Sequence, residues 1–471
     1  MTQMQTDHLR SLVLAGGGVR LAYHAGVLIA LEEAGVRFSH VDGTSGGIFG
    51  TAMLASGITP RQAAARWRGL KLRGFMRMLP LKEYLSFRKL RAIGGSRGIR
   101  EEIFPSLGID VEAIRRNTSL VTTYNVCNFS SKTMETIEGS QVTLDHLIAG
   151  MSLAIFSPAV RIGASWYTDG IWIKDANLSE AVKRGAREIW LVWCIGNTRP
   201  YLNGFFNQYV HMIEISANAG LFSELAWIRD LNEARKARGE EPLQIRVIKP
   251  RFPLPLDPDF FLGRINADTL INMGYAHTKQ YLRHPDPVSL TEIPSVTSME
   301  DPGITLHFRQ QFTGRLQGEG LLTVYLSLFI REREGRRERE LYASVAWEGQ
   351  VFLSGFNGLC WTEPDNTWAG SFQLETPAGP ALLTMSIPLH SRLLFLCGLD
   401  AKTARVTLKY EGGATAHGTL YQSALLRGKN LLHMNIRGSE GIWRKLRDRN
   451  RLLDSLFSQA DSSQTPSSSF L

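Results

Sequence analysis

His40-Val41-Asp42-Gly43-Thr44-Ser45-Gly46-Gly47 sets a serine between glycines, directly after a short extended stretch and directly before the helix-like run from Ile48 to Ser56. Gly43, Ser45 and Gly47 fill the three fixed positions of a G-x-S-x-G motif. Such a serine sits on a tight turn between a strand and a helix, where flanking side chains would clash and the helix N-terminus faces the reacting atom. The segment therefore predicts a strand-turn-helix unit that exposes Ser45 as a nucleophile, with Gly43 and Gly47 shaping the turn.

A second glycine-rich segment lies upstream, where the apolar run Leu12-Val13-Leu14-Ala15 leads into Gly16-Gly17-Gly18-Val19-Arg20. The backbone amides of such a loop can turn toward a developing negative charge. A glycine triplet before a helix is also compatible with a phosphate loop. However, no lysine follows at the P-loop position, and three contiguous glycines fit no G-x-G-x-x-G register. The loop is thus a candidate oxyanion cradle.

A serine with an ordinary pKa needs a base to take its proton. His211, His277 and His284 follow Ser45 in the chain, but their segments lack catalytic-loop character, so we expect them to be surface or packing residues. By contrast, the aromatic segment Trp166-Tyr167-Thr168-Asp169-Gly170 ends in an acid and a glycine. It favours a carboxylate, Asp169, held at the end of a strand.

Four blocks of the chain, in this order, resemble the patatin-like phospholipases, a family of lipid acyl hydrolases that use a Ser-Asp dyad. The blocks are Gly16-Gly17-Gly18-Val19-Arg20 with Gly26-Val27-Leu28, then Gly43-Thr44-Ser45-Gly46-Gly47, then Met151-Ser152-Leu153-Ala154-Ile155-Phe156-Ser157-Pro158-Ala159-Val160, then Asp169-Gly170. The resemblance covers about residues 9–285. It implies a three-layer α/β/α domain with a mainly parallel sheet.

By the same resemblance, Ser45 is the nucleophile and Asp169 the base, and the loop Gly16, Gly17, Gly18 and Val19 holds the oxyanion with support from Arg20. The implied reaction is cleavage of carboxylic esters in phospholipids, lysophospholipids or acylglycerols through an acyl-enzyme. It requires no metal and no cofactor. Two alternatives remain open: a lipid transacylase of the same fold, and a non-catalytic membrane-associated binding protein.

Three positions depart from the usual pattern of the family. Leu21 replaces a glycine after the arginine, Ile171 replaces the second glycine after the aspartate, and Met151 stands where alanine often precedes serine. None of these changes removes a reacting group. They are expected to alter the shape of the substrate site rather than its chemistry.

The sequence pattern divides the chain of 471 residues into several parts. Residues 1–285 alternate strand-like runs (Leu12–Ala15, Val41–Gly43, Leu120–Asn125 and Ile189–Ile195) with helices such as Ala22–Ala34 and Leu178–Gly185. A proline-rich linker follows at 286–303. Apolar residues then alternate with a period of two, which predicts a smaller antiparallel β-rich domain at 304–437 with a solvated hairpin centred on Gly335. Residues 438–471 are expected to form a basic helix and a disordered tail.

Composition limits the compartment and the partners. The N-terminal residues lack an apolar core, so no secretory signal is visible, and we expect a cytoplasmic protein that meets membranes peripherally. The four cysteines have no C-x-x-C spacing and are expected to be reduced thiols. The net charge of +9 favours an anionic partner. Because the twelve basic residues of segment 61–100 are interleaved with aromatic and aliphatic residues, this partner is expected to be a lipid surface met by the loop 74–80, and no nucleic acid.

Overall fold

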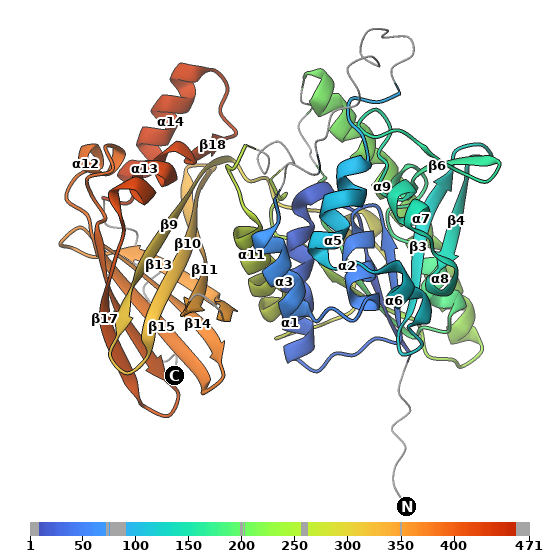
Figure 1. Cartoon of the computed structure of the whole chain (residues 1–471), viewed down its shortest axis with the longest axis horizontal. Coiled ribbons are helices and arrows are strands. Elements are labelled where there is room, and N and C mark those ends of the chain that lie inside the picture. Colours follow the sequence, from blue (N-terminus) through green and yellow to red (C-terminus); the bar gives the residue numbers. More distant parts are fainter. Residues whose placement is uncertain are drawn as a thin grey trace, which may run out of the picture. The chain divides into compact units, whose positions relative to one another are not determined.

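The computed structural model describes residues 9–71, 75, 91–197, 201, 203–255, 262–348 and 351–457. Its contacts divide the chain into two compact units. The first consists of Met1–Asp257 and Tyr281–Glu300, and the second of Pro258–Gln280 and Asp301–Leu471. Figure 1 shows both units coloured along the sequence.

The first unit is built on an eight-stranded sheet with the order β5-β6-β3-β2-β1-β7-β8, in which β4 also pairs with β3. The strands β1, β2, β3, β7 and β8 run parallel, whereas β4, β5 and β6 are attached by antiparallel pairs. Their bounds are β1 Arg10–Leu14, β2 His40–Thr44, β3 Val121–Asn128, β4 Thr133–Glu138, β5 Val160–Ile162, β6 Ser165–Asp169, β7 Glu188–Val192 and β8 Gln244–Ile248.

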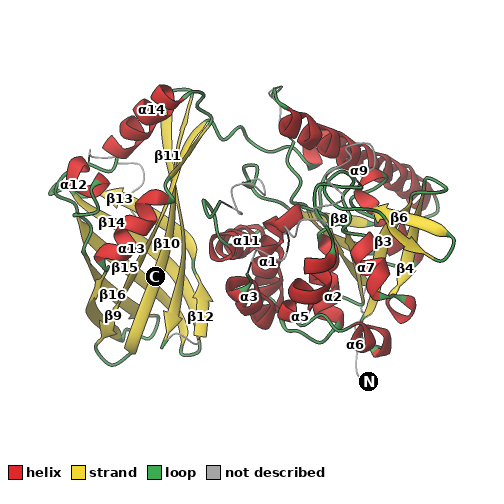
Figure 2. Cartoon of the chain, turned by 45° about the horizontal axis from the view of Figure 1, so that its top comes forward, coloured by secondary structure: helices red, strands yellow, loops and turns green. Residues whose placement is uncertain are grey.

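Helices cover both faces of this sheet, as Figure 2 shows for α9 on one side and α1 and α2 on the other. On one face, Leu191 and Val247 join Leu178 of α8 and Leu221 of α9 in a single buried cluster. Central strands with both faces covered are apolar along their whole length, which explains the run Leu12-Val13-Leu14 in β1. The helices are α1 Ala22–Glu33, α2 Gly47–Ala55, α3 Pro60–Gly69, α5 Phe104–Leu107, α6 Val111–Arg116, α7 Leu144–Ala149, α8 Leu178–Lys183 and α9 Phe205–Ala237.

The proline-rich segment that follows packs on the first unit. Lys249 donates hydrogen bonds from Nζ to the carbonyl oxygens of Ser295, Val296 and Ser298. Val296 and Met299 are buried in the same cluster as α9. These contacts fix the segment against the first unit, next to the cluster that contains α9.

The second unit is a ten-stranded antiparallel sheet, ordered β12-β11-β10-β9-β17-β16-β15-β14-β13, with β18 beside β9. Its edges return toward each other, because the Gly355 amide donates to the Ala343 carbonyl oxygen and a Cβ on Gly358 would lie 2.0 Å from the Leu341 carbonyl oxygen. The strands are β9 Ile304–Leu316, β10 Gly320–Arg333, β11 Arg336–Trp347, β12 Val351–Ser354, β13 Phe356–Thr362, β14 Thr367–Thr376, β15 Gly379–Pro388, β16 Thr403–Tyr410, β17 Thr415–Tyr421 and β18 Asn435–Arg437.

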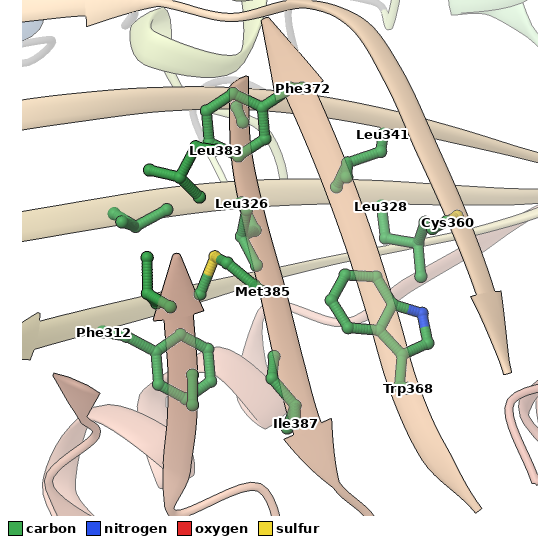
Figure 3. Packing of buried hydrophobic residues seen from close by; sticks show 14 of the residues in the cluster. Phe312, Leu326, Leu328, Leu341, Cys360, Trp368, Phe372, Leu383, Met385 and Ile387 are labelled. Carbon is green, nitrogen blue, oxygen red and sulfur yellow. The ribbon is translucent and has the colours of Figure 1, made fainter. Parts of the chain in front are cut away.

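The inner face of this curled sheet is the core of the second unit. Figure 3 shows Phe312, Phe372 and Trp368 meeting the aliphatic side chains of Leu326 and Leu383. Alternate residues of each strand point to this core, so the apolar period of two in the sequence reflects the alternation of inward and outward side chains along each strand. Three short helices, α12 Arg392–Leu396, α13 Ala424–Leu432 and α14 Ile442–Asp454, also belong to this unit.

Helix α11, Ala267–Tyr281, groups with the β-rich unit over nearly all of its length, although it precedes the proline-rich segment. Polar side chains join it to the sheet: Thr269 to Ser327 over 2.6 Å, Asn272 to Ser354 over 2.7 Å, and Asp268 to Ser344 over 2.9 Å. The contacts thus divide the chain before α11, whereas the sequence pattern places a boundary after residue 285.

The expected fold class is confirmed: a mainly parallel α/β/α unit is followed by an antiparallel β-rich unit. The hairpin around Gly335 is also present, with Arg333 opposite Arg336. Cys127, Cys194 and Cys360 are buried free thiols, and Cys397 is an exposed one. None of the helices in the described ranges combines the length and the apolar composition needed to cross a bilayer.

Candidate active site

Ser45 sits on the turn between β2, which ends at Thr44, and α2, which begins at Gly47. Its backbone φ is +51°, a conformation that residues other than glycine rarely adopt. The neighbouring glycines are required by close contacts, since a Cβ on Gly47 would lie 1.9 Å from the Leu14 carbonyl oxygen and one on Gly43 would lie 2.5 Å from Thr51 Oγ1. The turn therefore holds Ser45 in a strained position at the N-terminus of α2.

The side chain of Ser45 contacts that of Asp169. Ser45 Oγ donates a hydrogen bond to Asp169 Oδ2 over 2.8 Å, across 124 positions of sequence. Asp169 is the last residue of β6, which pairs with β3, and β3 in turn pairs with β2. The sheet thus brings the two sequence-predicted residues together.

Asp169 is nearly inaccessible, with 1% of its surface exposed. Burial raises its pKa to about 7, while hydrogen bonds from the Ile171 amide and from Ser45 act in the opposite direction. A carboxylate with a pKa near neutrality is suited to accept a proton at physiological pH. Ser45 is also buried, with 7% exposed, so the pair lies in an environment with little water.

The glycine loop between β1 and α1 lies against Ser45. A Cβ on Gly16 would be 2.8 Å from Ser45 Cβ and 3.1 Å from Ser45 Oγ. Gly18 has a φ of +60°, which favours glycine, and the Arg20 guanidinium donates to the Gly17 carbonyl oxygen over 2.7 Å. The loop therefore passes directly beside the hydroxyl, and Arg20 holds its backbone.

Asp175 is a residue of this site that the sequence pattern did not reveal. Its Oδ1 accepts a hydrogen bond from the Gly16 amide over 2.9 Å. Asp175 is fully buried, and burial together with the charge of Asp169 raises its pKa well above the ordinary value. The Gly16 amide is thereby engaged, which leaves Gly17, Gly18 and Val19 as the candidate donors of the loop. An acid six residues after Asp169 is visible in the sequence, but nothing there connects it to the glycine loop.

A buried polar network supports β2 just before the turn. Asp42 accepts hydrogen bonds from Thr123 and Asn125, both over 2.6 Å. Asn125 also donates to Thr44 Oγ1, and Asn177 donates to Asn125 Oδ1. Burial raises the pKa of Asp42 to about 7, while its hydrogen bonds with Thr123 and Asn125 act in the opposite direction. The network ties β2 to β3 next to Ser45, and it involves residues that sequence reasoning did not single out.

The block 151–160 acts through its backbone. The Ser152 carbonyl oxygen accepts from the Asp169 amide over 3.2 Å and from Thr168 Oγ1 over 2.6 Å. Ile155, in the same block, has a φ of +76°, which is strained for a β-branched residue. The block therefore braces the end of β6 that carries Asp169.

The structure accounts for two of the departures from the family pattern. Leu21 is buried and packs against Gly46, because a Cβ on Gly46 would lie 2.2 Å from Leu21 Cδ1. Ile171 contributes its amide to Asp169 Oδ1 over 2.9 Å, while its side chain is buried in the cluster beneath α9. Both side chains fill space without displacing Ser45 from Asp169.

The three histidines that were considered as possible bases for Ser45 have surroundings other than the Ser45 side chain. His277 Nε2 lies 2.9 Å from the Tyr342 hydroxyl in the second unit, and His211 lies 3.8 Å from Glu214. His284 follows helix α11 on a turn. Of the loop 74–80, only Phe75 belongs to the described residues, and the tail 458–471 lies outside them.

Comparisons with known proteins found a family model, curated relatives and a solved structure that are similar to parts of this chain. Residues 12–182 match the family model described as patatin-like phospholipase. Lysophospholipase NTE1 of Debaryomyces hansenii is 31% identical over 308 residues, covering 62% of this chain and 19% of that protein. Lysophospholipase nte1 of Aspergillus oryzae is 27% identical over 286 residues, covering 58% and 18%.

The chain thus spans about a fifth of the length of these relatives (19% and 18%). Among solved structures, VipD from Legionella pneumophila is 12% identical with a TM-score of 0.32, covering 59% of this chain and 67% of that one. The family match includes the glycine loop and the Ser45 turn and continues past Asp169 to Val182, the penultimate residue of α8. Residues 12–182 of this chain are a patatin-like phospholipase domain.

Proposed function

We propose that this protein is a serine lipid acyl hydrolase in which Ser45 attacks a carboxylic ester and Asp169 acts as its base. The observation that carries the proposal is the 2.8 Å hydrogen bond from Ser45 Oγ to Asp169 Oδ2. Covalent acyl transfer requires at least a nucleophile and a base within hydrogen-bond reach of it.

In the first half of the reaction, Asp169 takes the proton of the Ser45 hydroxyl while Oγ forms a bond to the ester carbonyl carbon. Negative charge then develops on the carbonyl oxygen. The amides of Gly17, Gly18 and Val19 are the donors for this oxyanion, and Asp175 positions their loop through Gly16. The N-terminus of α2 adds a favourable dipole on the same side as Ser45.

The tetrahedral intermediate collapses when the ester C–O bond breaks and Asp169 returns its proton to the leaving alcohol. The acyl group then remains on Ser45 Oγ. In the second half, Asp169 takes a proton from water, the resulting hydroxide attacks the acyl carbonyl, and the fatty acid leaves with Ser45 protonated again. If another alcohol replaces water in this step, the same residues perform transacylation.

A lipid ester as the substrate is supported by the family of the domain and by the names of the relatives, which are lysophospholipases. Because Asp169 is nearly inaccessible to water, the site also favours an apolar substrate that is desolvated when it binds. We therefore propose a phospholipid, lysophospholipid or acylglycerol as the substrate class, with no metal in the reaction.

The direct test is covalent labelling with a fluorophosphonate probe, combined with release of fatty acid from a panel of micellar lipids. The unsubstituted chain should be labelled and should release fatty acid, and Ser45→Ala should do neither. Labelling that persists in the Ser45→Ala variant would contradict the proposal. Addition of an acceptor alcohol separates the two reactions, because a transacylase transfers the acyl group to it and a hydrolase releases free acid.

A further inference from the structure

Three helices at one end of the β-rich unit carry an unusual set of exposed apolar side chains. Leu425 and Leu432 of α13 are 88% and 85% exposed, and Trp443 of α14 is 86% exposed. None of the residues of α13 is buried. We call this the C-terminal helical face, and the exposed apolar residues on its helices are Leu393, Leu394, Leu425, Leu432, Ile442, Trp443 and Leu446.

The helices of this face are neighbours. Arg392 of α12 forms an ion pair with Asp454 of α14 over 2.6 Å, and Arg427 of α13 donates to the Gly398 carbonyl oxygen just after α12 over 2.6 Å. Figures 1 and 2 both draw α12, α13 and α14 on the same end of the curled sheet. The exposed apolar residues therefore belong to one region and not to three isolated sites.

Basic side chains are interspersed among these apolar residues. The span 424–454, from α13 through α14, holds eight Lys or Arg residues against three acids, Glu440, Asp448 and Asp454. Two of these acids are already engaged, Asp448 by Ser439 and Arg451 and Asp454 by Arg392. Lys429, Arg444 and Lys445 are exposed beside the apolar residues. The face is consequently both apolar and positively charged.

In α14 the exposed apolar residues lie toward the N-terminal end of the helix, beside Arg444 and Lys445. Leu452 and Leu453, near its C-terminal end, are buried in the core of the unit, whereas Ile442, Trp443 and Leu446 are exposed. A helix that exposes Trp and Leu next to Lys and Arg matches the pattern of helices that lie in the interface of a bilayer. Trp is favoured there because its ring is apolar and its N–H can reach the polar headgroups.

We propose that the C-terminal helical face docks on an anionic lipid surface. The basic residues meet the headgroups, and Leu425, Leu432 and Trp443 enter the boundary between headgroups and acyl chains. A second protein is a poorer match, because Lys is depleted in the centres of protein interfaces whereas it is common on helices that meet membranes. The proposal goes beyond acyl hydrolysis and assigns the β-rich unit a role of its own: it brings the chain to a lipid aggregate.

Vesicle co-sedimentation of the full chain tests the proposal. The chain should carry Ser45→Ala so that lipid is not consumed. It should bind vesicles that contain phosphatidylglycerol more strongly than vesicles of phosphatidylcholine alone, and added salt should weaken that binding. The triple variant Leu425→Ser, Leu432→Ser and Trp443→Ser should lower the partition into anionic vesicles at least about tenfold.

Two control variants match these changes elsewhere in the same unit. Leu321 of β10 and Leu359 of β13 are exposed by 40% and 37%, so Leu321→Ser with Leu359→Ser removes exposed apolar side chains outside the face. Lys429→Glu with Lys445→Glu should weaken binding to anionic vesicles only, whereas Arg315→Glu with Arg336→Glu makes the same charge change on strands and should have a much smaller effect.

The proposal is overturned if the triple variant binds anionic vesicles as well as its parent does. It is also overturned if the parent forms a dimer in solution that the triple variant does not, because the face is then an interface between two copies. Both readouts are independent of catalysis. The Ser45-containing triple variant should cleave a water-soluble ester at the unsubstituted rate, so a failure of the proposed hydrolysis and a failure of docking are distinguishable.

Discussion

Ser45 Oγ and Asp169 Oδ2 are 2.8 Å apart, at the ends of two strands that are both neighbours of β3. The hydroxyl donates to a carboxyl group whose second oxygen is occupied by the Ile171 amide. Asp169 is therefore oriented by the backbone before any substrate arrives, and only its Oδ2 faces the hydroxyl. This relationship determines what each substitution should do.

Asp169→Asn should lower kcat by about 10² to 10⁴, the usual contribution of a general base. The asparagine can still accept from the Ile171 amide, but its other end then donates to Ser45 Oγ and cannot take a proton. Single-turnover hydrolysis of a soluble ester measures the loss. A variant that keeps full kcat would exclude Asp169 as the base.

The rate of acylation should rise with pH and reach half its maximum near pH 7, because only ionised Asp169 accepts the proton and its pKa is about 7. A pH profile of kcat/KM for the free enzyme reports this ionisation. A flat profile between pH 5 and pH 9 would contradict the assignment.

The same raised pKa has a consequence for stability. Asp169 binds a proton more tightly in the folded state than in the unfolded state, so its contribution to stability falls as pH rises from its ordinary pKa of 3.8 to its folded-state pKa of about 7. Asp169→Asn removes this penalty. Its Tm should exceed that of the unsubstituted chain at pH 8 and should match it near pH 4, which thermal unfolding at the two pH values measures.

Gly16→Ala should abolish most of the activity, because its Cβ would lie 2.4 Å from Asp175 Oδ1 and 2.8 Å from Ser45 Cβ. Asp175 offers a graded comparison. Asp175→Ala leaves the Gly16 amide without its acceptor and should slow fluorophosphonate labelling about tenfold to a hundredfold, on the scale of losing support for an oxyanion donor.

Asp175→Asn is the matched control, since an amide oxygen still accepts from Gly16 and the neutral side chain resembles the protonated acid favoured by burial. It should retain labelling within a few-fold of the unsubstituted chain. Equal losses in both variants would indicate that the charge of Asp175, and not its hydrogen bond, supports the site.

Helix α11 should be required by the β-rich unit. Asp268→Ala removes the acceptor of the Ser344 hydroxyl. Because an unpaired buried hydroxyl costs about 1–3 kcal/mol, the free energy of unfolding of this unit should fall by about that amount. Denaturant titration of the full chain measures the shift. A chain truncated after residue 285 should expose the buried side of α11 and aggregate. A chain truncated after residue 257 lacks α11 and therefore has no such surface to expose.

Local patterns were sufficient to predict the strands and the turn that carries Ser45. The apolar run before Gly16 and the period of two after residue 304 record which faces of each strand are buried. The G-x-S-x-G pattern is visible in the sequence because a Cβ at Gly43 or Gly47 would meet atoms of the same turn or of the adjacent strand, so these positions require glycine. Asp169 was singled out as an acid that ends an aromatic segment, and the resemblance to a family then gave it the role of base.

Asp175, Asn125 and Asn177 were missed because the hydrogen bonds from Gly16 to Asp175 and from Asn177 to Asn125 span 159 and 52 positions of sequence, and no local spacing marks such pairs. Helix α11 lies before the proline-rich segment, so the sequence boundary after residue 285 groups it with the α/β domain. Its side chains bond to β10, β11 and β12 instead, which only the packed structure reveals.

The amino-acid sequence by itself determined which elements form, because hydrophobic period, glycines at close contacts and caps act over a few residues. The tertiary structure decided which acid meets Ser45 Oγ, which acid holds the glycine loop, and which helices display their apolar residues to solvent. Those outcomes depend on the order of strands in the sheet and on burial, which raises the pKa of Asp169, and both are properties of the assembled chain.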